Sequence, residues 1–324
     1  MVRVKPSTPT KTRKGFTLIE LMIVIVILAV LAALLLPALG RARGSVRQAA
    51  VRAEITKLEG AINAFKARYG VEPPSRIVLY EDPSVAGAWN NSPNAEALDS
   101  LATLTQIWPE FNKALPRDWN GDGDMTDSRA ELTQGECLVF FLGGIPNNGS
   151  GGVGFSPRGF SKDPANPAAL GGSREGPFFE FDVQRLVDVG GQVGFPEYKD
   201  TFPGQRNPYL YFSSYDGAGY REQLSGVTYP EYGSTGPSIA YRQGALLISA
   251  TFKSKSFQII SPGQDFTYGP GGPYVAGAQD PLPGWATSST APAGWVGPTL
   301  SFSSADRVSE RDNITNFSNG VLAP

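Results

Sequence analysis

The hydrophobic pattern begins with an unbroken apolar run near the N-terminus. From Phe16 to Leu36 there are 21 residues, and Glu20 is the only charged one among them. A helix rises about 1.5 Å per residue, so this run spans roughly 31 Å, close to the hydrocarbon thickness of a bilayer. A carboxylate inside such a run costs on the order of 2.5–3.5 kcal/mol on insertion scales. The pattern therefore predicts a transmembrane helix over residues 16–36. The cost of inserting the carboxylate indicates that Glu20 has a functional role.

Downstream of this run the apolar positions become periodic. Between residues 51 and 69 they recur at alternating intervals of four and three, which places them on one face of a helix. These positions are Val51, Ile55, Leu58, Ile62, Phe65 and Tyr69. Gly70 ends the pattern, so we predict one long helix over residues 16–70. Pro37 lacks an amide hydrogen and Gly40 is flexible, and we expect the helix to bend or melt between them.

The pattern beyond the long helix predicts a loop-rich head over residues 71–324. The chain contains 38 Gly and 27 Pro, and most of them follow residue 70. A helix is predicted over residues 95–111, and residues 131–142 are either a helix or a buried strand. Aromatic and β-branched residues cluster in three segments, which we predict as strands: residues 209–213, 245–251 and 257–260.

The charges before the apolar run predict its orientation. The first fifteen residues hold five basic residues and no acidic one. The positive-inside rule keeps such a flank in the cytoplasm, so we expect the head to be exported. An ordinary signal peptide also has a basic start, and Ala38-Leu39-Gly40 could serve as its small-residue cleavage site. Against that alternative, the apolar run is longer than the roughly 7–15 residues of a removable signal, and it contains Glu20.

The junction between the basic flank and the apolar run carries a family resemblance. Lys14-Gly15-Phe16-Thr17-Leu18-Ile19-Glu20, followed by an apolar stretch and Pro37, resembles the prepilin signature of type IV pilins and of type II secretion pseudopilins. The resemblance implies that a prepilin peptidase removes residues 1–15 by cutting after Gly15, and that Phe16 is then methylated. It also implies that Glu20 pairs with the terminal ammonium of Phe16 on a neighbouring subunit. The alternative is a plain membrane anchor in which Glu20 snorkels to the interface.

This resemblance also implies a fold and a set of partners. The expected fold class is α+β, with a long N-terminal helix, transmembrane and then amphipathic, packed on a small antiparallel sheet beneath an enlarged head. The expected function is that of a structural subunit of a type IV pilus-like or type II secretion pseudopilus filament. The expected partners are homologous pilin-like subunits, the prepilin peptidase, the inner membrane and a filament assembly platform.

Composition narrows the remaining alternatives. Residues 70–324 carry 16 basic and 27 acidic residues, a net charge of −11, and phosphate contacts need clustered basic residues, so we expect no nucleic-acid binding. The chain has no histidine, which removes the usual general base and histidine-ligated zinc. Cys137 is the single cysteine, and we interpret it as a buried small hydrophobe. We expect no enzyme; the alternative is a membrane-anchored exported enzyme or glycan-binding module, whose sugar platform would expose aromatics such as Trp285 and Trp295.

A first candidate calcium loop lies in the head. The segment from Asp118 to Asp124 places Asp118, Asn120, Asp122 and Asp124 at alternate positions, with Gly123 at the sixth, like the opening of a calcium loop. The twelfth position of that frame is Arg129 instead of a glutamate, so Asp127 or Glu131 would have to close the ligand shell. The alternative is a polar surface turn of Asp, Asn and Gly.

A second candidate calcium loop lies near the C-terminus. The strand and loop over residues 257–265, with the glycines of residues 269–272 and the later Asp312, are similar to the C-terminal loop of major pseudopilins. The resemblance implies that Asp265 and Asp312 hold calcium, with Ser261 as a weaker oxygen donor. This sequence departs from the family pattern at Phe266, where a glycine is usual, and in the long insertion over residues 273–311. The alternative is a glycine-rich loop without an ion.

Overall fold

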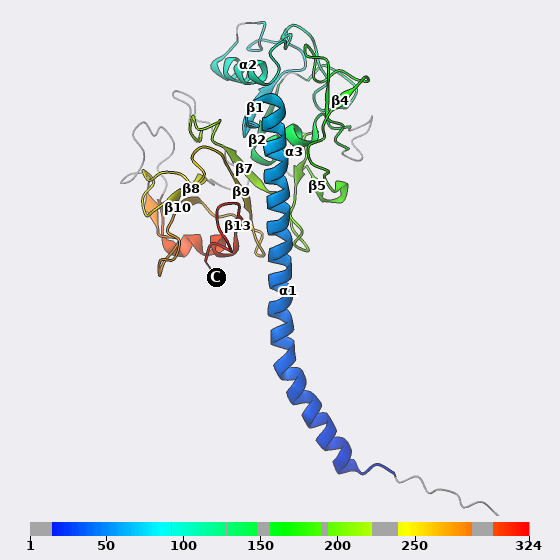
Figure 1. Ribbon diagram of the computed structural model, residues 1–324, viewed down its shortest axis with the longest axis vertical. Helices are drawn as coiled ribbons and strands as arrows, with labels where there is room; N and C mark the ends of the chain where they lie inside the picture. The colour runs from blue at the N-terminus through cyan, green and yellow to red at the C-terminus, as the bar shows by residue number, and fades with distance from the viewer. Residues whose placement is uncertain are drawn as a thin grey trace, which may run out of the picture. The chain divides into compact units, whose positions relative to one another are not determined.

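The computed structural model describes residues 15–91, 93–127, 129–147, 156–188, 194–221, 239–286 and 301–323 (Figure 1). The chain divides into two compact units, Met1–Arg47 and Gln48–Pro324. Each unit is described by itself.

The first unit contains the start of the long helix α1, which runs from Leu18 to Tyr69. Its segment Leu18–Leu36 has a mean hydropathy of 3.2 and no buried residue, and it is long and apolar enough to cross a membrane. The helix continues without interruption through residues 37–40, so the expected melting is not found. A proline inside a helix removes only one backbone hydrogen bond, and the flanking turns keep theirs.

The second unit buries the predicted face of α1. Val51, Leu58 and Phe65 are fully buried there, in one core cluster with side chains of a three-stranded antiparallel sheet and of helix α3. The sheet has the order β13-β9-β7, from strands Ile314–Thr315, Phe257–Ser261 and Leu210–Ser213. Figure 1 shows this sheet beside the C-terminal part of α1. The α+β prediction, with a helix packed on a small antiparallel sheet, is confirmed.

Two predicted segments differ from the observed elements at their ends. Helix α2 spans Ala95–Ile107 instead of residues 95–111, because Trp108 is extended and precedes Pro109, which disfavours a helical residue before it. The segment over residues 131–142 is both a strand and a helix: β2 at Ala130–Thr133 leads into α3 at Gln134–Gly143. A capping box between Thr133 and Glu136 starts α3.

The strand predicted over residues 245–251 is wrong. Strand β8, Ile239–Gln243, lies before this segment and pairs in parallel with β10, Gly271–Tyr274. Gly244, at a φ of +104°, then starts a turn in which the Ser249 amide donates to the Leu246 carbonyl at 3.0 Å. The turn buries Leu247 and leaves its neighbours exposed, so the β-branched and aliphatic run does not form a ladder.

The remaining elements are short, as expected for a loop-rich head. Strand β1, Arg76–Leu79, pairs with β2 in antiparallel register. Three further antiparallel pairs join two-residue strands: β3 with β4 (Phe160–Ser161, Arg174–Glu175), β5 with β6 (Leu186–Val187, Glu197–Tyr198) and β11 with β12 (Trp285–Ala286, Ser301–Phe302). Two 3₁₀ helices, η1 at Val183–Arg185 and η2 at Ser304–Asp312, complete the described elements.

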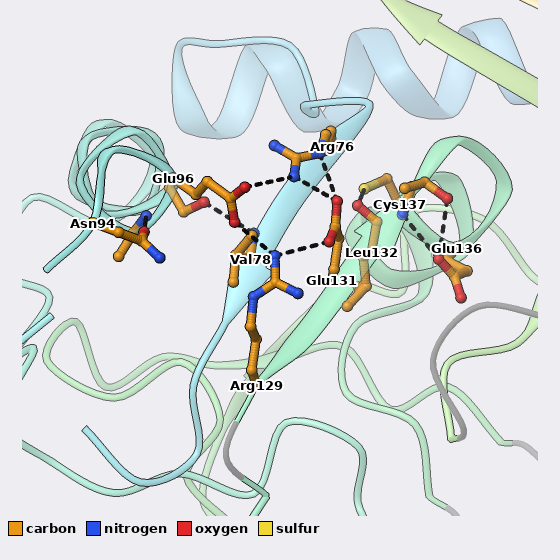
Figure 2. A network of polar contacts seen from close by, with 12 residues as sticks. Arg76, Val78, Asn94, Glu96, Arg129, Glu131, Leu132, Glu136 and Cys137 are labelled. Carbon is orange, nitrogen blue, oxygen red and sulfur yellow. Dashed lines mark hydrogen bonds and ion pairs between the residues drawn. The ribbon is translucent and has the colours of Figure 1, made fainter. Parts of the chain in front are cut away.

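Ion pairs connect elements of the head that no disulfide joins. Figure 2 shows one such network, in which Arg76 of β1 and Arg129 both contact Glu131 of β2. Arg129 also pairs with Glu96 of α2 at 2.6 Å. Cys137 is buried in α3, as predicted, and its thiol donates to the Leu132 carbonyl at 3.4 Å.

Candidate functional site

The N-terminal residues of the predicted processing site lie outside the helix. Gly15 and Phe16 precede α1, Phe16 is 80% exposed, and no described residue lies within 4 Å of where a Cβ on Gly15 would be. The Gly15–Phe16 peptide bond is therefore accessible and non-helical among the described residues. Lys14 and the rest of the basic flank lie outside the described residues.

Glu20 makes a local contact that the sequence reasoning missed. Its carboxylate accepts hydrogen bonds from the Thr17 amide at 2.9 Å and the Thr17 hydroxyl at 2.8 Å. The Glu20 amide in turn donates to the Thr17 hydroxyl at 3.3 Å. This reciprocal arrangement is a capping box, and its signal, a threonine three residues before a glutamate at the start of an apolar run, is readable in the sequence. Glu20 thus stabilises the start of α1 within its own chain, whatever it contacts in an assembly.

The apolar surface of the first unit is exposed among the residues that the structure describes. Side chains such as Ile19, Leu31 and Leu34 are 66%, 50% and 71% exposed. An exposed apolar surface of this extent marks a membrane or protein contact. The segment is thus long and apolar enough to cross a membrane, and it is exposed along its whole length.

The first candidate calcium loop is ordered by its own side chains. The buried Asp118 carboxylate accepts from the Gly121 amide at 2.5 Å and from the Gly123 amide at 3.0 Å. The Asn120 side-chain oxygen accepts from the Asp122 amide at 3.0 Å, and the Asp122 carboxylate accepts from the Asp124 amide at 2.9 Å. The Asp124 carboxylate accepts from the Thr126 amide at 2.8 Å, so each of the four predicted ligands closes a turn of the loop.

A residue far away in the sequence supports this loop. Glu81, which follows β1, is buried and accepts from the Trp119 amide at 2.8 Å and the Asp127 amide at 3.4 Å, and so it holds both ends of the loop. Burial raises the pKa of Glu81 to about 7, against the opposing effect of these amide hydrogen bonds. No local sequence pattern could have assigned Glu81 to this loop, because helix α2 separates Glu81 from its partners along the sequence.

The two residues suggested to close the calcium shell have different surroundings. Asp127 lies at the loop, where its carboxylate accepts from the Asn120 side-chain amide at 2.8 Å. Glu131 is instead held by Arg129 at 2.8 Å and by Arg76 (Figure 2). Glu131 is therefore engaged by two guanidinium groups, and of these two residues only Asp127 lies at the loop.

The second candidate calcium loop does bring Asp265 and Asp312 together. Asp312 accepts from the Gln264 amide at 2.5 Å and the Asp265 amide at 2.9 Å, so its carboxylate caps the turn that contains Asp265. Burial raises the pKa of Asp265, and the nearby negative charge of Asp312 raises it further. Phe266 has a φ of +65°, the left-handed conformation that glycine adopts without strain, which accounts for the glycine usual at this position.

Ser261 is engaged next to this second loop. Its hydroxyl donates to the Asp200 carboxylate at 2.6 Å and accepts from the Gly263 amide at 3.2 Å. Asp200 is a buried acid that the sequence reasoning missed, because it lies sixty residues before the loop. Across the residues that the structure describes, no three Asp, Glu, Cys or His side chains converge to hold a metal ion. Amide or carbonyl oxygens would have to complete either shell.

The sugar platform considered for the head is not found at Trp285. Its side chain is 4% exposed, and its indole nitrogen donates to the Gly271 carbonyl at 2.9 Å. Trp295 lies outside the described residues.

The exposed apolar helix and its N-terminal junction define a class, the prokaryotic proteins with an N-terminal methylation motif, whose family model matches residues 10–36. The chain is 35% identical over 118 residues to the type II secretion system core protein G of Klebsiella michiganensis, across 35% of this chain and 72% of that protein. It is 29% identical over 142 residues to the protein of the same description from Klebsiella pneumoniae, across 42% of this chain and 89% of that protein. The chain belongs to the family of type II secretion system core protein G, the pseudopilins. No solved structure matches it significantly.

Proposed function

We propose that this protein is a structural subunit of a type II secretion pseudopilus, assembled from the inner membrane through its N-terminal helix. The observation that carries this proposal is the fully exposed apolar segment Leu18–Leu36, which directly follows the Gly15-Phe16 junction and contains Glu20. Membership of the core protein G family supports it. More than half of the chain lies outside either alignment with those relatives.

Processing and orientation are parts of the same proposal. The prepilin peptidase cuts between Gly15 and Phe16 on the cytoplasmic side, and the head lies on the far side of the inner membrane. Mass spectrometry of the membrane and filament fractions should find chains that begin at a methylated Phe16. Chains that begin at Arg41 would instead establish an ordinary signal peptide and remove the main support for the filament.

The role proposed for Glu20 in assembly is charge pairing with the terminal ammonium of Phe16 on a neighbouring subunit. In a filament core without water, an unpaired carboxylate is costly, and an opposite charge offsets that cost. The capping box with Thr17 is a competing explanation for the same residue, since it needs no neighbour.

Three substitutions separate these two roles. Glu20→Gln keeps an oxygen that accepts from Thr17 but removes the charge, Thr17→Val removes the hydroxyl but keeps the charge, and Glu20→Ala removes both functions. If charge pairing governs assembly, Glu20→Gln and Glu20→Ala give few filaments while Thr17→Val assembles normally. Normal filament yield from Glu20→Gln, with loss in Thr17→Val, would assign Glu20 to the cap alone. Membrane insertion and processing are measured in parallel, so that an assembly defect is not confused with loss of the protein.

Calcium is the cofactor that we propose for the head. Its net charge of −11 and the absence of a disulfide favour a divalent cation as a structural link. The Asp118–Asp124 loop supports this because its side-chain oxygens alternate along a preformed turn, and calcium accepts six to eight oxygens in flexible geometry. Asp265 with Asp312 is the second choice, because their carboxylates share one turn.

Thermal denaturation tests the calcium proposal. An ion that binds only the folded state at a hundredfold excess over its Kd stabilises by about 2.7 kcal/mol. Millimolar calcium should therefore raise the melting temperature of the full chain relative to chelator, and magnesium should substitute poorly because it resists losing its waters. Asp122→Ala and Asp265→Ala identify which loop is responsible. An unchanged melting temperature would remove calcium from both loops.

A further inference from the structure

A pocket of about 310 Å³ opens on the second unit, where α1, α2, β3 and β4 meet. The ends of α1 and α2 contribute Tyr69 and Trp108, and the segment around β3 contributes Lys162 and Asp163. These elements lie in the same part of the head, near the C-terminal end of α1 (Figure 1). The volume is at the lower end of the range of small-ligand sites, about 300–1,000 Å³.

The walls of the pocket are held in place before any ligand binds. The ring of Trp108 packs edge-on against Tyr69 at 5.7 Å and against Phe160 at 5.0 Å between centroids. The loop after β3 is fixed by the buried Arg117, whose guanidinium donates to the Ala165 carbonyl at 2.9 Å. A preformed pocket binds without the cost of ordering its walls.

The charged groups of the pocket are only partly paired with each other. Arg68 donates to Glu175 through its Nε at 3.1 Å, and the Lys162 ammonium lies 4.0 Å from the same carboxylate oxygen. Asp163 accepts from the Ala165 amide at 3.0 Å through one of its two oxygens. Among the described residues, the second oxygens of both carboxylates have no further hydrogen-bond or ion-pair partner, and beyond Glu175 the Arg68 guanidinium contacts only the Tyr69 ring, 5.4 Å from its centroid.

Two hydroxyl groups add donors to the pocket. Burial raises the pKa of Tyr69 to about 12, so its hydroxyl stays protonated and can donate. The Ser161 hydroxyl accepts from the Asp163 amide at 3.1 Å and retains its own hydrogen. Within the described part of the chain neither hydroxyl hydrogen has an acceptor.

The combination of these groups specifies the chemistry of the ligand. Two cations and two carboxylates give the lining no net charge, which favours a neutral ligand over an anion or a cation. Unused donors and unused acceptors lie side by side, and a sugar hydroxyl both donates and accepts. Pro109 and Pro164 supply apolar surface for the C–H groups of a sugar ring. We propose that this pocket binds one pyranose unit of a neutral glycan.

Saturation-transfer NMR on the full chain in lipid nanodiscs tests this proposal, because nanodiscs avoid glycoside detergents. The probes are the methyl glycosides of glucose, galactose, mannose and N-acetylglucosamine, with methyl glucuronide as the anionic comparison. At least one neutral glycoside should bind, and Tyr69→Phe and Asp163→Asn should each weaken it about tenfold, the equivalent of one hydrogen bond.

Matched variants distinguish the pocket from a general effect on the fold. Tyr220→Phe removes a hydroxyl that donates to the Lys253 carbonyl at 2.9 Å, and Asp182→Asn changes a carboxylate that accepts from the Gln184 amide at 3.1 Å, both outside the pocket. These two variants should bind like the unmodified chain. The proposal is overturned if no neutral glycoside binds, if only the glucuronide binds, or if the pocket variants bind as well as their controls.

Discussion

Replacing Arg307 with methionine should destabilise the C-terminal part of the head more than any surface ion-pair substitution. Arg307 and Glu310 of η2 are both fully buried, and two guanidinium nitrogens each donate to a Glu310 oxygen at 2.7 Å. The third nitrogen donates to the carbonyls of Pro273 and Pro283 at 2.6 and 2.7 Å. One side chain thus links η2 to β10 and to the loop before β11.

The expected magnitude follows from what Arg307→Met leaves behind. Removing one partner of a buried ion pair costs about 3–5 kcal/mol, because the remaining carboxylate is buried without an opposite charge. Each of the two carbonyls that lose a donor adds about 1 kcal/mol. We therefore expect a loss of about 5–7 kcal/mol. The double variant Arg307→Met with Glu310→Leu removes the stranded carboxylate as well, so it should lose less than the single variant.

Urea denaturation of the full chain, followed by tryptophan fluorescence and hydrogen exchange, measures this loss. Arg129→Met is the control, since its ion pairs with Glu96 and Glu131 are partly exposed and should contribute about 1 kcal/mol or less. The cost of Arg307→Met should also shrink as the pH falls, because the stranded Glu310 can then take up a proton. A loss below that of Arg129→Met, or a double variant less stable than the single one, would refute the argument.

Two further predictions concern the pH dependence of stability and one glycine. Burial, with the negative charges of Glu136 and Asp188, raises the pKa of Glu197 to about 8, so the free energy of unfolding should fall as the pH rises from about 4.5 to about 8. Glu197→Gln should remove most of that fall, so in thermal melts the variant should be more stable than the unmodified chain by a few kcal/mol at high pH and differ little from it at pH 5. The same dependence of stability on pH in both chains would mean that Glu197 is solvated. Gly263, at a φ of +70°, has no room for a methyl group, which would lie 2.4 Å from the Asp312 carbonyl oxygen. Gly277 is the control, because it has a φ of +78° but nothing within 4 Å of an added methyl group, so Gly277→Ala should cost about 1 kcal/mol of stability. Gly263→Ala should cost more than this. Equal losses of stability would show that the turn at Gly263 shifts freely.

The parts of the fold that depend on local periodicity could be predicted from the sequence. The apolar positions from Val51 to Phe65 are predicted to share one face of a helix, and that face is buried. The prediction works because residues that repeat every 3.6 positions lie on the same side of an α-helix. The strand expected over residues 245–251 failed because aliphatic composition alone does not distinguish a ladder from a turn that buries one residue in three. The hydrophobic period does not determine where an element ends. Helix α2 ends at a separate local signal, Pro109.

The polar interior could not be predicted, because its partners are distant in sequence. Glu81 holds a loop that begins 37 residues later, and the Ser261 hydroxyl donates to Asp200. Glu54 of α1 binds Arg185 and accepts from the Tyr209 hydroxyl at 2.8 Å. These contacts join residues that are far apart in the sequence, so no regular spacing of residues predicts them. The first candidate loop was readable from spacing, because its four candidate ligands lie within seven residues, whereas Asp265 and Asp312 are 47 residues apart and were joined only by the family resemblance.

The basic residues of helix α1 differ in whether they have acidic partners, according to their position along the helix. Lys66 pairs with Glu72 at 3.2 Å and Asp216 at 2.6 Å, and Arg68 pairs with Glu175, so the end of α1 is neutralised by its own head. Arg43 and Arg47 have no acidic partner among the described residues. Together with the apolar segment that is exposed among the described residues, these two arginines form a basic and apolar surface of the kind that suits anionic lipid headgroups. The first unit thus exposes its apolar and basic groups, whereas in the second unit the last turn of α1 is paired with acids of its own head.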